Sequence, residues 1–180
     1  MVLSLAVVMA GVLVFFLFAM PKGHGQSVKV VSDATGSVRS FARQAPYQVL
    51  APTGLGQRLW KPTSVHMQVP GSVAGAAHRA DLTIGYVIDR PGDQTYARYE
   101  VTNDPSAVQQ LLGDRPVTGR STIGGQTWEI RRDEAGHLAL TRAAGTATLI
   151  VDDGGSSGGA DQADLEALAA SLRPVATASS

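Results

Sequence analysis

Residues 117–151, VTGRSTIGGQTWEIRRDEAGHLALTRAAGTATLIV, decide the fold class because they predict four consecutive β-strands. Apolar and polar side chains alternate along each segment, which is the period of a strand with one buried face. Short glycine-containing turns separate the segments, and connections this short join antiparallel neighbours. We therefore expect a meander with strands over 117–123, 126–132, 137–142 and 146–151.

A second group of strands precedes this meander. Residues 64–69 alternate in the same way and predict one strand. Segments 82–89 and 94–102 flank Arg90-Pro-Gly-Asp93, in which proline presets the second turn position and glycine supplies the positive φ of the third. They predict a β-hairpin. Residues 47–62, which are dense in proline and glycine, predict an irregular connection before these strands.

Three segments show helical spacing of apolar residues. Residues 38–45 form one stripe that Pro46 ends, and Arg39 and Arg43 lie off it. The functional interpretation of these two arginines is contact with lipid head groups, and the alternative is a solvated helix face. Asp104-Pro105 predicts the start of a second helix, with Asp as N-cap and Pro in the first turn.

The third helix predicts how the sheet is covered. It begins near Asp161, which can cap it, and Pro174 stops it. Its apolar stripe comprises Leu165, Leu168, Ala169 and Leu172. We expect an α+β fold, in which an antiparallel β-sheet of about six to seven strands has its helices packed on one face.

The amino-terminal stretch 1–20, MVLSLAVVMAGVLVFFLFAM, contains no charged side chain. A helix of this length is about 30 Å long, which matches the hydrocarbon core of a bilayer. We expect a transmembrane anchor over 1–21, a linker over 22–36, an α+β domain over 37–174 and a disordered tail over 175–180. A cleaved signal peptide is the alternative, although its apolar region would be unusually long.

The orientation of this span has two interpretations. Lys22 and Lys29 follow it, and the positive-inside rule alone would place the domain in the cytoplasm. The chain has no cysteine, which is compatible with an exported domain. We expect a single-pass protein of the plasma membrane whose domain is extracytoplasmic.

Composition excludes several classes of function. Fifteen basic and fifteen acidic residues cancel, so we expect no nucleic-acid partner. The absence of cysteine removes disulfides, thiol nucleophiles and thiolate metal ligands. No histidine pair has the spacing of a helical metal motif, and no G-x-S-x-G elbow occurs. We therefore assign no catalytic, cofactor-binding or metal-binding residue, and we expect no cofactor.

Some residues keep a functional interpretation beside a structural one. His66 and His137 fall on predicted polar strand faces, where they could meet as a zinc or proton-relay pair. Weak calcium binding by Asp152 and Asp153 is a further hypothesis, against simple turn formation. The candidate residues of a ligand pocket are Trp60, Tyr86 and Tyr99, whose alternative role is to complete the core.

Several motifs together resemble domain-of-unknown-function family 4245. They are GQTW at 125–128, GHLALTR at 136–142, TATLIV at 146–151, LEALAASL at 165–172, APYQVLAPTGL at 45–55 and IGY at 84–86. The resemblance implies an actinobacterial protein with a single amino-terminal span and a domain that faces outward. The family has no assigned activity, so the resemblance supplies no catalytic residues.

These observations favour a membrane-anchored cell-envelope protein that is not an enzyme and acts as a binding or accessory domain. Its partners would be the membrane, through the amino-terminal span, and an envelope protein or a lipid ligand. A structural subunit of a larger membrane complex would have the same sequence features. The alternatives are an envelope hydrolase with a dispersed active site and a secreted protein with a cleaved signal peptide.

Overall fold

The structure of the chain is a computed structural model that describes residues 31, 34–72, 77–155 and 158–176. The predicted transmembrane anchor lies outside these residues, as does most of the predicted linker. Within the described ranges, no helix is both long enough and apolar enough to cross a membrane.

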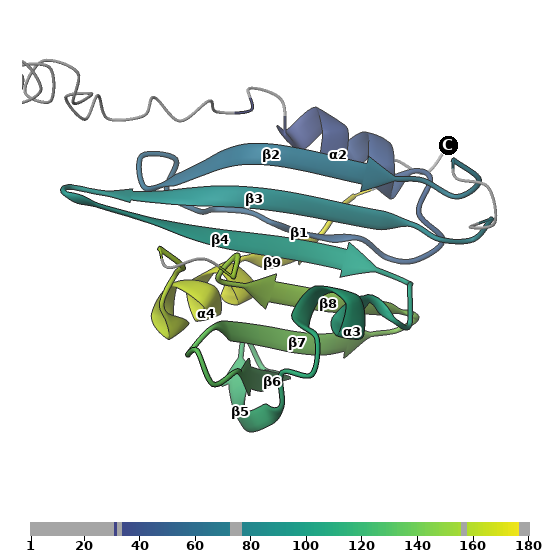
Figure 1. Ribbon diagram of the computed structural model, residues 1–180. Helices are drawn as coiled ribbons and strands as arrows, with labels where there is room; N and C mark the ends of the chain where they lie inside the picture. Colours follow the sequence, from purple (N-terminus) through teal and green to yellow (C-terminus); the bar gives the residue numbers. More distant parts are fainter. Residues whose placement is uncertain (1–30, 32–33, 73–76, 156–157, 177–180) are drawn as a thin grey trace, which may run out of the picture.

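The centre of the fold is a seven-stranded antiparallel sheet, as the sequence predicts (Figure 1). Its strand order is β2-β3-β4-β8-β7-β6-β5, so the pairing of β4 with β8 joins the hairpin to the meander. The strands are β2 (Trp60–Gln68), β3 (Asp81–Arg90), β4 (Asp93–Thr102), β5 (Val117–Ile123), β6 (Gln126–Arg132), β7 (Leu138–Ala144) and β8 (Ala147–Asp152).

The main hydrophobic core lies on one face of this sheet, beneath helices α2 (Ala34–Ala42) and α4 (Gln162–Ala170). Strand residues two apart share a face, and the inward rows expected from the sequence are found in this core. Helix α2 contributes Phe41, and α4 contributes Leu165 and Leu168, all fully buried. The apolar stripe of each helix therefore packs onto the apolar rows of the strands.

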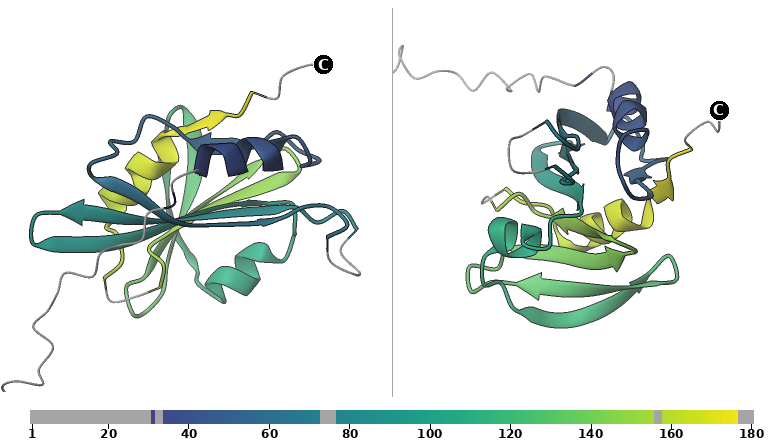
Figure 2. Two further views of the ribbon diagram at one scale, coloured as in Figure 1. Left: turned by 90° about the horizontal axis from the view of Figure 1, so that it is seen from above. Right: turned by 90° about the vertical axis from the view of Figure 1, so that its right-hand side faces the viewer.

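Helix α3 (Ala107–Leu112) packs on the opposite face, so the expectation that the helices cover one face is wrong for this helix (Figure 2). Ala107 and Leu112 contact Ala139 of β7 and Ile150 of β8, and both strand residues are inaccessible to solvent. The physical reason is that β7 and β8 are central strands with apolar side chains on both faces, as buried strands have.

Two element starts differ from the sequence-based expectation. Strand β2 begins at Trp60, inside the segment expected to be irregular. Pro62 fits there because β2 is an edge strand, and the register shifts between Pro62 and Ser64. The N-cap of α3 is Ser106 rather than Asp104, because the Asp104 carboxylate accepts a hydrogen bond from the Ser106 amide (2.8 Å) and forms a turn before the helix.

The carboxy-terminal helix is shorter than its leucine spacing suggests. Asp161 caps α4 as predicted, with its carboxylate accepting from the Asp164 amide (2.9 Å). The helix ends at Ala170, and Leu172 belongs instead to a strand, β9 (Leu172–Pro174). This strand pairs antiparallel with β1 (Leu50–Pro52) to form a separate two-stranded sheet over the main core.

The described structure extends past both predicted ends of the folded domain. Helix α2 begins at Ala34, within the segment 22–36 that the sequence predicts as a linker. At the other end, the Val175 amide donates to the Val49 carbonyl (2.9 Å). The amide of Val31 donates to the Pro62 carbonyl (2.8 Å), which places the chain that enters α2 beside edge strand β2.

Candidate ligand-binding groove

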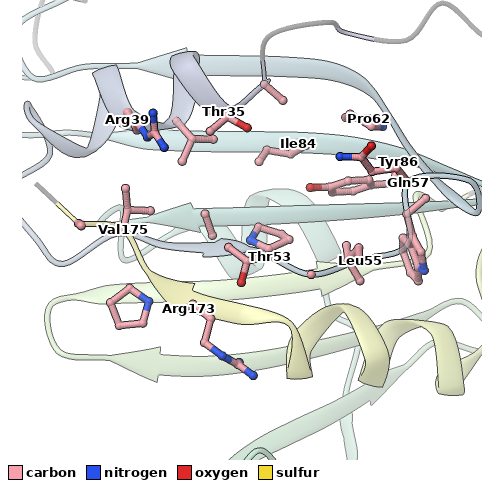
Figure 3. Close-up of a pocket in the computed structure, with 18 residues that line it drawn as sticks. Thr35, Arg39, Thr53, Leu55, Gln57, Pro62, Ile84, Tyr86, Arg173 and Val175 are labelled. Atoms are coloured by element: carbon pink, nitrogen blue, oxygen red, sulfur yellow. The ribbon is translucent and has the colours of Figure 1, made fainter.

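A groove of about 490 Å³ lies between α2, the β1–β9 pair, the start of β2 and the middle of β3 (Figure 3). Its volume is within the range of about 300–1,000 Å³ that is typical of small-molecule sites. Apolar surface comes from Leu55, Trp60 and Ile84 and from the ring of Tyr86. Polar groups come from Thr35, Arg39, Thr53, Gln57 and Arg173. This combination of an apolar lining with a few polar groups is typical of ligand sites.

Strand geometry positions the two aromatic residues of the groove. Ile84 and Tyr86 are two residues apart on β3 and therefore share the face that α2 covers. Trp60 starts the neighbouring strand, and its ring meets the ring of Tyr86 edge-on, with 6.0 Å between ring centroids and 78° between the planes. Both side chains are more than nine-tenths buried, so the aromatic pair is held firmly by the core.

The hydroxyl group of Tyr86 distinguishes it from the other inward-facing tyrosines. The Tyr47 hydroxyl lies 2.8 Å from the Ala80 carbonyl oxygen and 3.1 Å from that of Val101, and Tyr99 donates to the Leu50 carbonyl. Among the described residues, the Tyr86 hydroxyl has no hydrogen-bond partner, although only 8% of the residue is exposed. It points into the groove (Figure 3).

The Tyr86 hydroxyl is protonated, and burial strengthens its preference for this state. Desolvation raises the pKa of Tyr86 above its ordinary value of 10.0, so the phenol is neutral at physiological pH. A neutral phenol both donates and accepts hydrogen bonds. The hydroxyl is not among the buried polar atoms that lack a partner within the described residues, so it reaches the open groove, where water or a polar ligand atom can bond to it.

The electrostatic character of the groove is positive. Two of its lining residues are arginines, and none of the lining residues that the structure describes is acidic. Arg39 is exposed on α2, and it forms no ion pair within the described part of the chain. Arg173 of β9 donates through Nη1 to the carbonyls of Ala170 (2.7 Å) and Leu172 (2.8 Å), so part of its guanidinium is already engaged.

The structure brings together two of the three candidate pocket residues. Trp60 and Tyr86 line the groove, whereas Tyr99 is fully buried in the core with its hydroxyl bonded to β1. Sequence reasoning missed Thr53, Leu55 and Arg173, because it did not detect the pairing of β1 with β9. The sequence did single out Arg39, because it lies off the apolar stripe of residues 38–45 and was interpreted as a contact for lipid head groups.

The histidine hypothesis is wrong. His66 lies on edge strand β2, while His137 directly precedes β7, and strands β3, β4 and β8 separate the two. His137 instead places Nδ1 3.3 Å from the Asp153 carboxylate. Within the described ranges, no group of three or more histidine, aspartate or glutamate side chains is arranged to hold a metal ion.

Asp152 and Asp153 are buried and bonded within the fold rather than free for calcium. Arg98 Nε donates to the Asp152 carboxylate (2.9 Å), and burial raises the pKa of that carboxyl above its ordinary value. Asp153 accepts from the amides of Leu138 (2.8 Å) and Gly155 (2.9 Å). Both aspartates therefore fix the ends of β7 and β8 and the loop that follows them.

The cleft beside His137 bears on the hydrolase alternative. It contains His137 together with Asp153 and Asp161. The described lining residues of this cleft include no serine, threonine or cysteine that could act as a nucleophile. Asp161 caps α4 and Asp153 binds two backbone amides, so both carboxylates already have structural partners.

Fold and groove together define a class of protein, a single α+β domain that presents a helix-covered groove at one side of an antiparallel sheet. The chain belongs to the DUF4245 family, described as "Protein of unknown function", whose match covers residues 1–172. No curated protein and no solved structure matches the chain. Family membership confirms the resemblance seen in the sequence, and the function is argued from the groove.

Proposed function

We propose that this chain is a membrane-anchored cell-envelope protein whose α+β domain binds a small ligand in the groove and does not catalyse a reaction. The observation that carries the proposal is Tyr86: its side chain is more than nine-tenths buried, while its hydroxyl reaches the open space of the groove without a partner among the described residues. A ligand with a polar atom above the Trp60–Tyr86 pair would satisfy this hydroxyl and cover the aromatic rings.

Support for anchoring comes from the amino-terminal sequence. Residues 1–20 carry no charge and have the length of a membrane-spanning helix. The extracytoplasmic placement of the domain belongs to the same proposal, and its support is the cysteine-free composition.

Support for a binding role rather than catalysis comes from the chemistry of the lining. The described residues that line the groove include no histidine, aspartate, glutamate, serine or cysteine. Thr35, Thr53 and Tyr86 carry hydroxyls, but nucleophilic catalysis by a hydroxyl requires a base within hydrogen-bond reach, and the described lining supplies no histidine, carboxylate or lysine for that role. The polar atoms in the groove are instead hydroxyls, one amide and guanidinium groups, which suit recognition.

The proposal predicts that an alkyl chain can enter the groove and contact Trp60. The chain contains two tryptophans, so Trp128→Phe leaves Trp60 as the only tryptophan reporter. We expect brominated dodecyl maltoside, mixed into dodecyl maltoside micelles that hold the full chain, to quench Trp60 fluorescence strongly, because bromine quenches on contact. The measurement is the fluorescence as a function of the brominated fraction.

The matched control is Trp60→Phe, which leaves Trp128 as the reporter. Trp128 is 1% exposed and does not line the groove. Its fluorescence should respond little to the brominated detergent. Equal and weak quenching of both tryptophans would show that the groove admits no alkyl chain and would contradict the proposal.

A further inference from the structure

Both charged residues that line the groove in the described part of the chain are arginines, Arg39 and Arg173. Arg39 lines the groove from α2 and has no acidic partner among the residues described, whereas several other arginines form ion pairs, such as Arg90 with Asp164 and Arg98 with Asp152. Figure 3 shows Arg39 and Arg173 on opposite sides of the groove. Guanidinium groups bind phosphate and carboxylate oxygens through paired hydrogen bonds, so this site suits an anionic group.

The same ligand must also have an apolar part. Leu55, Trp60 and Ile84 present apolar surface within the groove, next to the ring of Tyr86. Arg39 and Tyr86 add polar groups to this apolar lining. A molecule that satisfies both has an acidic head and a hydrocarbon body, and is therefore an anionic amphiphile.

The chain length between the apolar amino terminus and the groove gives a source for such a molecule. Residues 22–33 separate the predicted anchor from α2, and fully extended they reach at most about 43 Å. Under the proposed anchoring, the groove therefore stays within that distance of the bilayer surface. The most abundant amphiphiles within this reach are the lipids of that membrane.

We infer that the groove binds an anionic phospholipid of the membrane in which the chain is anchored, an inference that rests on the proposed function. Arg39 binds the phosphate group, and the Tyr86 hydroxyl hydrogen-bonds to an oxygen at the base of the head group. An acyl chain lies against Trp60, Leu55 and Ile84. Arg173 adds positive charge but contributes fewer direct bonds, because its Nη1 is engaged with the Ala170 and Leu172 carbonyls.

The test compares two lipids that have the same acyl chains and a phosphate group but differ in the net charge of the head group. The full chain with Trp128→Phe is held in dodecyl maltoside micelles, and phosphatidylglycerol or phosphatidylcholine with identical brominated acyl chains is added. We expect phosphatidylglycerol to quench Trp60 at a mole fraction about tenfold lower than phosphatidylcholine, which is the ratio that one charge-assisted contact supplies.

Matched variants assign this preference to the groove. Arg39→Gln should abolish the preference for phosphatidylglycerol, whereas Arg43→Gln should keep it, because Arg43 is also exposed but does not line the groove. Arg173→Gln should reduce the preference by less than Arg39→Gln does. Both Arg39 and Arg43 are exposed, so neither change removes buried contacts from the fold.

The outcomes separate this inference from the proposed function. If both lipids quench Trp60 equally, or if the Arg39 and Arg43 variants lose the preference equally, the inference of a specific anionic lipid site is overturned while the groove remains a binding site. If neither lipid and no brominated detergent quenches Trp60, the inference and the proposed function both fail.

Discussion

Replacing Leu168 by aspartate is expected to unfold the domain at room temperature. The Leu168 side chain is fully buried in the main core, where α4 contacts strands β4, β7 and β8. A carboxylate at this position would have no described basic partner on the apolar stripe, and burying an unpaired charge is among the most damaging single changes. We expect a loss of more than about 4 kcal/mol in the free energy of unfolding.

The matched control for this substitution is Ala167→Asp, one residue earlier on the same helix. Ala167 is exposed, so the new charge would stay in water and change the free energy of unfolding by no more than about 0.5 kcal/mol. Urea denaturation followed by circular dichroism measures both variants. A folded Leu168→Asp protein with a near-normal urea midpoint would show that α4 does not pack on the sheet as described.

Trp128→Ala has the second-largest expected effect. The Trp128 indole lies on β6 and is 1% exposed. The Arg142 guanidinium lies over it, with 5.1 Å between the Arg142 Cζ atom and the centroid of the indole ring. Removal of this side chain leaves a cavity that the neighbouring strands cannot fill, and it removes the surface on which Arg142 rests. We expect a loss of about 3–5 kcal/mol in the free energy of unfolding.

Two further variants define the cause of this loss. Trp128→Phe keeps an aromatic ring and should cost clearly less, which also makes it suitable for the fluorescence experiments. Thr127→Ala changes the exposed neighbour on the same strand and should have little effect. A Trp128→Ala protein as stable as the Thr127→Ala protein would contradict the packing of β6 against the core.

Local patterns predicted the strands of the meander and hairpin well, because each strand has one apolar face and each turn carries its own signal. Gly92, for example, has the positive φ of 78° that the Arg90–Asp93 turn requires. The burial of the opposite sheet face beneath α3 was missed because the same alternation assigns that face to solvent. Ala139 and Ile150 fall on the side that alternation assigns to solvent, and only the position of α3 shows that they are buried.

The groove illustrates what local patterns cannot supply. The candidate pocket residues were Trp60, Tyr86 and Tyr99, because a sheet with a helix on one face could hold a pocket, and the first two line the groove. Two walls of the groove, however, come from Leu50–Pro52 and Leu172–Pro174, which pair across more than a hundred residues of sequence. Leucine spacing favoured a longer final helix, and the tertiary pairing with β1 overrode it.

The central claim is that the Tyr86 hydroxyl serves a ligand rather than the fold, and Tyr47 provides a matched comparison. We expect Tyr47→Phe to lower the free energy of unfolding by about 1–3 kcal/mol, because it removes the hydroxyl hydrogen that is shared between the Ala80 and Val101 carbonyls. Tyr86→Phe removes a hydroxyl without a described protein partner, so it should leave that free energy unchanged or slightly higher.

The most direct measurement is therefore urea denaturation of the two tyrosine variants, combined with Trp60 quenching by brominated phosphatidylglycerol. The account predicts that Tyr86→Phe keeps its stability but needs about fivefold more lipid for the same quenching, as expected for one lost hydrogen bond. A Tyr86→Phe protein that is destabilised as much as Tyr47→Phe, with unchanged quenching, would show that the hydroxyl supports the fold and would contradict the account.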